Sequence, residues 1–136
     1  MDEVLREDEV TPERIEALAK QARIPAAPDE HGTLVFREEG RSAYVRVDTG
    51  RKIIIFFNVW ALRPQFSLDE KLQYVNGLNN GMILVRFAMP RPEVLWCDYQ
   101  LLFEGGISPV NIINTYKLFA SACRAAVAMD KKDMVV

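Results

Sequence analysis

The sequence predicts a single α+β domain in which helices pack against one antiparallel sheet. Its 136 residues are the length of one ordinary domain, and 49% of them are hydrophobic, which is ample for one core. Periodic segments follow one another in the order α-β-β-β-α-β-β-α, and short turn-like links join them. Helices on one face of such a sheet would leave its other face partly open.

The first half of the chain is expected to form one helix and three strands. Thr11 can cap the first helix, Pro12 suits its first turn, and Glu13 suits its dipole. Pro25 forbids its continuation. Three runs with strand character follow, at residues 33–38, 42–48 and 53–57. The last run is continuously apolar, which is typical of a strand that is covered on both faces.

The second half is expected to form two helices and two strands. Ser67 and Glu70 make a capping-box pattern at the start of the second helix, and Gly81 ends it. Strands are expected at residues 82–88 and 94–103. Ser108 and Pro109 start the last helix by the same capping logic. The five strands should together form one antiparallel sheet.

Composition divides the chain into three segments. Residues 1–10 are expected to be an acidic, flexible N-terminal segment, residues 11–130 the folded domain, and residues 131–136 a frayed C-terminus. The first segment is rich in carboxylates and the last has mixed polarity.

The overall charge and hydropathy argue against several kinds of partner. The net charge is −2, and nucleic-acid affinity comes largely from neutralised phosphates, so we expect no nucleic acid partner. No run approaches the roughly 18 apolar residues of a membrane span, so we expect no membrane partner. The acidic start differs from the basic start of a secretory signal, which favours a cytoplasmic location.

The sequence shows no catalytic constellation. His31 is the only histidine, and nothing in the sequence places it beside a nucleophile. Cys97 and Cys123 lie in apolar surroundings and are expected to be free buried thiols. With His31 they fit no zinc pattern. Asp98 is expected to be a polar residue on the less buried sheet face, so we expect no enzyme, no metal and no cofactor.

Seven residues carry a resemblance to a known family: Asn76, Asn79, Arg86, Leu101, Gly105, Gly106 and Phe119. The chain resembles the YbjN-type family, named as bacterial sensory transduction regulators, from about Glu13 onward. Members of that family resemble type III secretion chaperones in fold, and those chaperones are usually homodimers that bind partner proteins. The resemblance therefore implies the same element order, a homodimer with a protein partner, and neither catalytic residues nor a cofactor.

Arginine and aromatic side chains predict a protein interface on the sheet. By alternation, three arginines should point away from the core: Arg37, Arg46 and Arg86. Five further side chains should share or neighbour that face: Tyr44, Ile54, Phe56, Leu84 and Trp96. Both residue types are enriched at protein interfaces, and the apolar third strand needs a cover. We therefore expect a non-enzymatic protein-binding regulator or chaperone-like adaptor, whose partner contacts Arg46, Phe56, Arg86 and Trp96.

A small-ligand sensor is the alternative interpretation. A cleft between the last helix and the sheet, near Tyr99, Asn111 and Tyr116, could hold a metabolite. Asn76 and Asn79 are expected to have a structural role as hydrogen-bonding residues at the end of the second helix.

Overall fold

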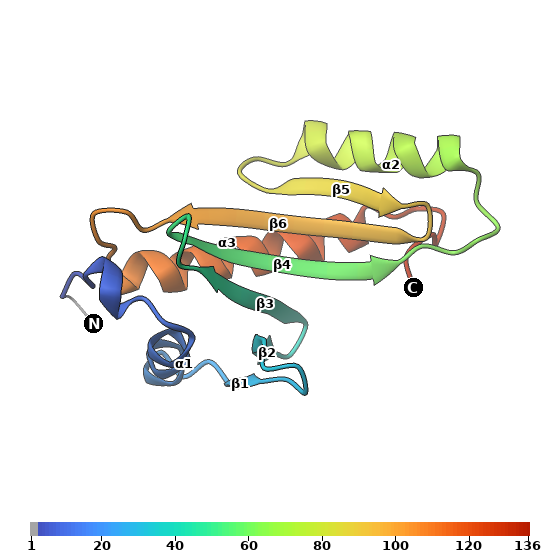
Figure 1. The fold of residues 1–136 in the computed structure, drawn as a ribbon. Helices are drawn as coiled ribbons and strands as arrows, with labels where there is room; N and C mark the ends of the chain where they lie inside the picture. The colour runs from blue at the N-terminus through green and yellow to red at the C-terminus, as the bar shows by residue number, and fades with distance from the viewer. Residues whose placement is uncertain (1–2) are drawn as a thin grey trace.

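The computed structural model describes residues 3–136, and its elements follow the expected α+β order (Figure 1). The helices are the 3₁₀ helix η1 (Glu7–Glu9), α1 (Pro12–Gln21), α2 (Leu68–Gly81) and α3 (Pro109–Ala128). The strands are β1 (Ala26–Pro28), β2 (Leu34–Glu38), β3 (Arg41–Asp48), β4 (Ile53–Ala61), β5 (Arg86–Arg91) and β6 (Val94–Leu102). The strands form one sheet in the order β1-β2-β3-β4-β6-β5, and every neighbouring pair is antiparallel.

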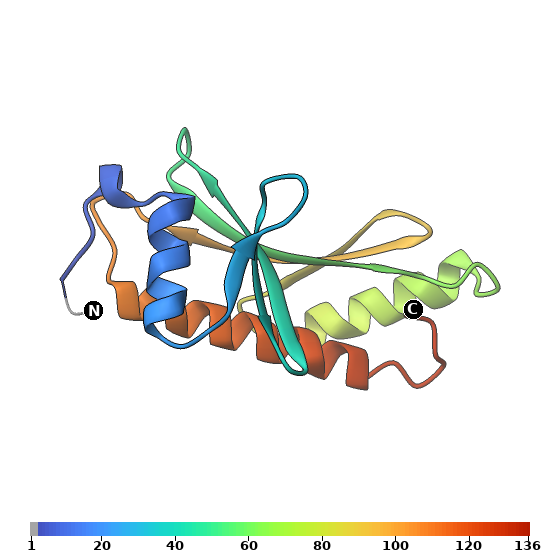
Figure 2. The same ribbon diagram turned by 90° about the horizontal axis from the view of Figure 1, so that it is seen from below.

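The three α-helices leave one face of the sheet uncovered. Figure 2 shows α3 running along one face, with α1 near one end of it and α2 beside β5. The core lies between α3 and the sheet, where Phe56 stands near Phe119 and Phe36 contacts Tyr116, with ring centroids 6.3 and 4.7 Å apart. Within residues 3–136, no α-helix covers the opposite face, which we call the open face.

Two of the three capping signals in the sequence act as expected, whereas Ser108 makes no side-chain capping hydrogen bond at the start of α3. The Thr11 hydroxyl accepts a hydrogen bond from the backbone N–H of Arg14, which starts α1. Ser67 and Glu70 form both hydrogen bonds of the capping box at the start of α2. These contacts depend on neighbours in the sequence, so local pattern alone identifies them.

Two strands differ from the expectation, and both contain proline. The short strand β1 was not expected, because Pro25 and Pro28 bracket it. An edge strand tolerates proline, since its outer N–H groups need no partner in the sheet. Strand β5 starts only at Arg86, because Leu84 has a positive φ of 69°. It continues through Pro90, where a shift of register relative to β6 accommodates the missing donor.

The N-terminal segment packs against the domain, contrary to the flexible segment expected at residues 1–10. Met1 and Asp2 lie outside the described residues. Leu5 pairs with Ile107 in an antiparallel bridge and is 1% exposed. Gly106 permits this approach, because a Cβ atom there would lie 2.9 Å from the carbonyl oxygen of Leu5. Two buried apolar residues, Leu5 and Val10, thus anchor a segment whose charges alone suggested disorder.

An ion pair holds the same segment to the turn between β3 and β4. Lys52 and Glu7 form it, and the backbone N–H of Gly105 donates a second hydrogen bond to Glu7. These contacts, led by the one with Lys52, lower the pKa of Glu7 below its ordinary value. The carboxylates of the segment therefore contribute to its docking.

The C-terminus is also tied to the sheet, contrary to the frayed end expected at residues 131–136. Val135 pairs with Leu62, and Met134 is buried. The carboxylate of Asp130 accepts hydrogen bonds from the backbone N–H groups of both Met134 and Val135. Polar and apolar contacts together hold the C-terminal segment in place. The residues that make these contacts follow no periodic pattern, so the sequence did not predict them.

Tyr74 should make the stability of the fold sensitive to alkaline pH. Its hydroxyl donates to the carbonyl of Ala126 at 2.8 Å, and burial, followed by the charge of Asp130, raises the pKa of Tyr74 to about 12. Above the ordinary value of 10.0 an unfolded tyrosine loses its proton while the folded one retains it. The free energy of unfolding should therefore fall as the pH rises from 10 toward 12, by about 1–2 kcal/mol for this group.

Urea denaturation at pH 8 and at pH 11 checks this expectation. Tyr74→Phe should lose less stability than the wild type between the two pH values. An equal loss in both proteins would contradict the role assigned to Tyr74.

Candidate protein-binding face

Strand register defines which side chains occupy the open face. Tyr44 lies opposite Phe57, Phe57 lies opposite Asp98, and Asp98 lies opposite Arg86. Directly opposed residues in antiparallel strands share a face of the sheet, so these four form one row across β3, β4, β6 and β5. Arg46 belongs to the same face, because it is two residues from Tyr44 on β3.

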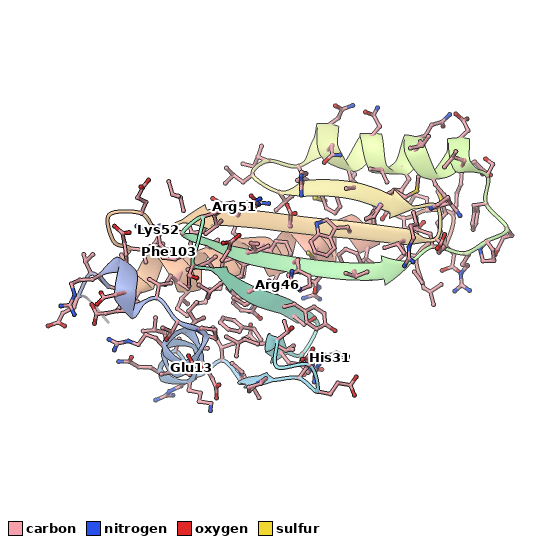
Figure 3. The ribbon with its side chains drawn as sticks, viewed as in Figure 1. Glu13, His31, Arg46, Arg51, Lys52 and Phe103 are labelled. Carbon is pink, nitrogen blue, oxygen red and sulfur yellow. The ribbon has the colours of Figure 1, made fainter. Side chains whose placement is uncertain are left out.

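Three aromatic rings stack along this face. The ring centroids of Tyr44 and Phe57 are 5.3 Å apart with 19° between the planes. Those of Phe57 and Trp96 are 4.9 Å apart with 12° between the planes. The guanidinium carbon of Arg46 lies 4.9 Å from the centroid of the Phe57 ring, within cation–π range. Figure 3 looks onto this face, and the labelled Arg46 lies where β3 and β4 run side by side.

A charged pair borders the aromatic stack. Asp98 accepts hydrogen bonds from Arg86 Nε at 3.2 Å and Arg86 Nη2 at 2.6 Å, and a third from Trp96 Nε1 at 2.7 Å. The hydrogen bonds with Asp98 raise the pKa of Arg86 above its ordinary value. Asp98 is only 3% exposed although it lies on the open face, because Arg86 and Trp96 cover it. The Arg86 side chain is 65% exposed, so a partner could reach it.

We call these residues the open-face cluster: Tyr44, Arg46, Phe57, Arg86, Trp96 and Asp98. Apolar side chains on the same face surround it. Val59 lies opposite Trp96 on the neighbouring strand, and Leu102 lies opposite Ile53. Val59 and Leu102 are exposed. The open face therefore combines stacked rings, guanidinium groups and exposed aliphatic groups.

The structure confirms the placement of some expected residues on this face and corrects others. Arg37, Arg46 and Arg86 all face away from the core, as the alternation predicted. Phe56 does not: it is 0% exposed and packs near Phe119 on the helix side. Ile54, likewise fully buried, lies two residues away on the same side of β4.

Phe57 occupies the place that the sequence interpretation gave to Phe56. The run from Ile53 to Phe57 is apolar at every position, so alternation of polar and apolar residues carries no information about its faces. Only the pairing with Arg46 and Asp98 on neighbouring strands assigns the faces of β4.

The structure gives the three residues expected to bind a small ligand different surroundings. Tyr116 is fully buried, and its hydroxyl donates to Glu38 Oε1 at 2.8 Å. Burial and this hydrogen bond raise its pKa. Asn111 is exposed on the first turn of α3, and Tyr99 is half-buried. Because Tyr116 has no free surface or free hydroxyl, it offers a ligand nothing to contact.

Asn79 has a structural role, with a different partner from the one expected. Its Oδ1 atom accepts from the backbone N–H of Phe87, and its Nδ2 atom donates to the carbonyl of the same residue, both at 2.9 Å. The amide thus pairs with the outer edge of β5, as another strand would. This contact protects an edge that could otherwise pair with a second chain. No side-chain hydrogen bond of Asn76 occurs within residues 3–136.

The remaining chemistry-bearing residues lie apart. His31 is exposed in the loop between β1 and β2, and Figure 3 shows it well away from Arg46. Cys97 and Cys123 are free thiols and both are buried. A hydrogen bond with Cys123, together with burial, raises the pKa of the Cys97 thiol, which disfavours the reactive thiolate. In the described part of the chain, no three His, Cys, Asp or Glu side chains are grouped closely enough to hold a metal ion.

Comparison with known proteins places this fold in a family. The sequence profile named YbjN, described as "Putative bacterial sensory transduction regulator", matches residues 11–129. The chain belongs to the YbjN family. A structure titled "Crystal structure of YbjN, a putative transcription regulator from E. coli" is similar, with a TM-score of 0.79 over 97% of this chain and 98% of that chain. Sequence identity is 10%, so this likeness shows the fold alone. None of the curated proteins compared with the chain matches it significantly.

The description of the YbjN family names a regulator and no enzyme activity. It fits a regulatory or adaptor role for this member. Its α+β fold agrees with the one the sequence predicted. In the part of the chain that the structure describes, no helix combines the length and the apolar character that crossing a membrane requires.

Proposed function

We propose that this YbjN family member is a non-enzymatic, homodimeric regulator that acts as a chaperone-like adaptor and holds a partner protein against its open face. The observation that carries the proposal is the open-face cluster on a sheet face without a covering helix. Tryptophan, tyrosine and arginine are the residues that most often dominate binding energy at protein interfaces. Four of the cluster's six residues are of these types: Tyr44, Arg46, Arg86 and Trp96.

The geometry of the cluster supports binding without large rearrangement. Asp98 holds both Arg86 and Trp96 by hydrogen bonds, so their side chains are oriented before a partner arrives. Ordering side chains in advance removes part of the entropic cost of association. The mixture of rings and guanidinium groups favours a partner segment with apolar and acidic side chains.

A homodimer is part of the proposal because apolar side chains remain exposed outside the open-face cluster. Leu68 and Leu72 lie one turn apart on α2, and Ile83 and Leu84 follow that helix. All four are exposed, and such groups of apolar residues mark association surfaces. A second copy of the chain could cover them and leave the open face to the partner protein.

Trp96→Asp should abolish partner capture while the protein remains folded. The substitution removes a stacked ring from the open face. It also places a second carboxylate beside Asp98, and burying that charge in an interface with a partner would be strongly unfavourable. The measurement is affinity capture from the native host's lysate, read by mass spectrometry, with the mass of the purified chain determined in solution. A stoichiometric protein should be present with the wild type and reduced at least about tenfold with the variant.

Leu118→Asp is the matched control, because Leu118 is an exposed apolar residue of α3. It introduces the same charge away from the open face and should leave capture unchanged. Equal capture by wild type and Trp96→Asp would overturn the assignment of the surface. A monomeric mass for the wild type would overturn the homodimer.

A further inference from the structure

Strands β3 and β4 separate at one end and leave a cavity above α3. Their pairing stops at Tyr44 and Phe57, whereas β4 stays paired with β6 as far as Ala61. Figure 1 shows β3 diverging from β4 toward the start of β3. A cavity of about 380 Å³ lies at this fork. Its lining residues are Gly40, Arg41, Ser42, Tyr44, Asn58, Val59, Trp60, Ala120, Cys123, Arg124 and Val127. We call it the fork cavity.

Asn58 presents an unused acceptor to the fork cavity. The residue is only 7% exposed, and its Nδ2 atom donates to the carbonyl of Ser42 at 2.9 Å and to Cys123 Sγ at 3.4 Å. No described residue donates a hydrogen bond to its Oδ1 atom. Every fully buried side-chain oxygen in residues 3–136 does have a partner, so this atom retains some accessible surface. Since Asn58 lines the fork cavity, a bound molecule could supply the missing donor.

The fork cavity also carries positive charge. Arg41 pairs with Glu38 at 3.4 Å, but Arg124 makes no ion pair or side-chain hydrogen bond with any residue of the described range. The Arg124 guanidinium lies over Gly40, where a Cβ atom would be 3.6 Å from Nη1. Among the described residues that line the cavity, none is Asp or Glu. An arginine guanidinium without an ion-pair partner, in a cavity that no carboxylate lines, favours binding of a ligand carboxylate.

Apolar side chains also line the fork cavity. Trp60 and Val59 contribute from β4, and Ala120 and Val127 contribute from α3. Small-molecule sites combine such apolar side chains with a few placed polar groups, and the volume of about 380 Å³ is within their usual range.

We propose that the fork cavity binds a small amphipathic hydroxy acid. Arg124 takes the carboxylate, with Arg41 nearby, and Asn58 Oδ1 accepts a hydrogen bond from the hydroxyl group. The apolar body of the ligand lies against Trp60 and Val127. This goes beyond the proposed protein-binding function, and it gives the chain a separate site for a metabolite.

Tyr44 connects the two sites, because it lines the fork cavity and stacks on Phe57 in the open-face cluster. Ligand binding could therefore influence partner binding. The test below measures ligand binding to the purified chain, so its result is independent of whether a partner protein exists.

L-phenyllactate is the probe, and Trp60 is the reporter. The chain has two tryptophans, so Trp96→Phe leaves Trp60 as the one source of tryptophan fluorescence. Titration with L-phenyllactate should give a saturable fluorescence change. 3-Phenylpropionate lacks the hydroxyl group and should bind roughly 3–10-fold more weakly. 1-Phenylpropan-2-ol lacks the carboxylate and should give no saturable change. Calorimetric titration of the wild-type chain repeats the comparison without the substitution at Trp96.

Arg124→Gln should weaken L-phenyllactate binding at least about tenfold, because it removes a charge-assisted hydrogen bond. Arg14→Gln is the matched control. Arg14 is also an exposed arginine on a helix, and its side chain makes no ion pair within residues 3–136. That variant should bind as tightly as the wild type. Equal affinity of Arg124→Gln and the wild type would overturn the proposal, as would the absence of saturable binding by calorimetry.

Discussion

Arg86→Met should lower the free energy of unfolding by about 2–3 kcal/mol. Asp98 is 3% exposed and depends on Arg86 for two of its three hydrogen bonds. Methionine has similar length and no charge, so the substitution leaves a desolvated carboxylate with Trp96 as its one remaining donor. Urea denaturation followed by circular dichroism measures the loss.

Asp98→Asn in the Arg86→Met background should recover most of the lost stability. The asparagine oxygen can still accept from Trp96 Nε1, and the neutral amide has a far smaller desolvation cost than a carboxylate. The matched control is Arg46→Met, since Arg46 contributes a cation–π contact to the open face and should cost no more than about 1 kcal/mol. Equal losses for the two arginine variants, or no recovery in the double variant, would show that the Arg86–Asp98 pair is not the source of the effect.

The same variants bear on function. If Asp98 orients Arg86 and Trp96 for a partner, the stable double variant should still capture that partner less well than the wild type. A loss of binding without a loss of stability would separate the role of the pair in recognition from its role in the fold.

The sequence was sufficient for the order of elements because the signals that mark them are local. Thr11, Ser67 and Glu70 form the caps that their spacing indicated. The three arginines of the open face also obey simple alternation, because each lies next to a buried apolar residue of its strand: Phe36, Val45 and Phe87 respectively.

The sequence was insufficient where tertiary contacts decide. Phe56 and Phe57 are chemically identical neighbours in an apolar run, and pairing with β3 and β6 alone places Phe57 on the open face. The fork cavity arises from the divergence of β3 and β4, which no residue spacing encodes. Arg124 and Asn58 lie far apart in the sequence, so neither signals that they line the same cavity.

Leu5→Ala should destabilise the domain by about 2–3 kcal/mol, although Leu5 lies in a segment whose acidic residues predict flexibility. Its side chain is 1% exposed, and its backbone exchanges two hydrogen bonds with Ile107 at 2.8 and 3.0 Å. Truncation to alanine removes buried methyl groups and leaves a void beside the turn that Gly106 forms. Val4→Ala is the matched control, because Val4 is the apolar neighbour of Leu5 in the sequence and its side chain is exposed. This substitution should change the free energy of unfolding by less than about 0.5 kcal/mol. Urea denaturation measures the free energy of unfolding of both variants. If the segment is docked, Leu5→Ala should lose much more stability than Val4→Ala; if the segment is flexible, the two losses should be equal.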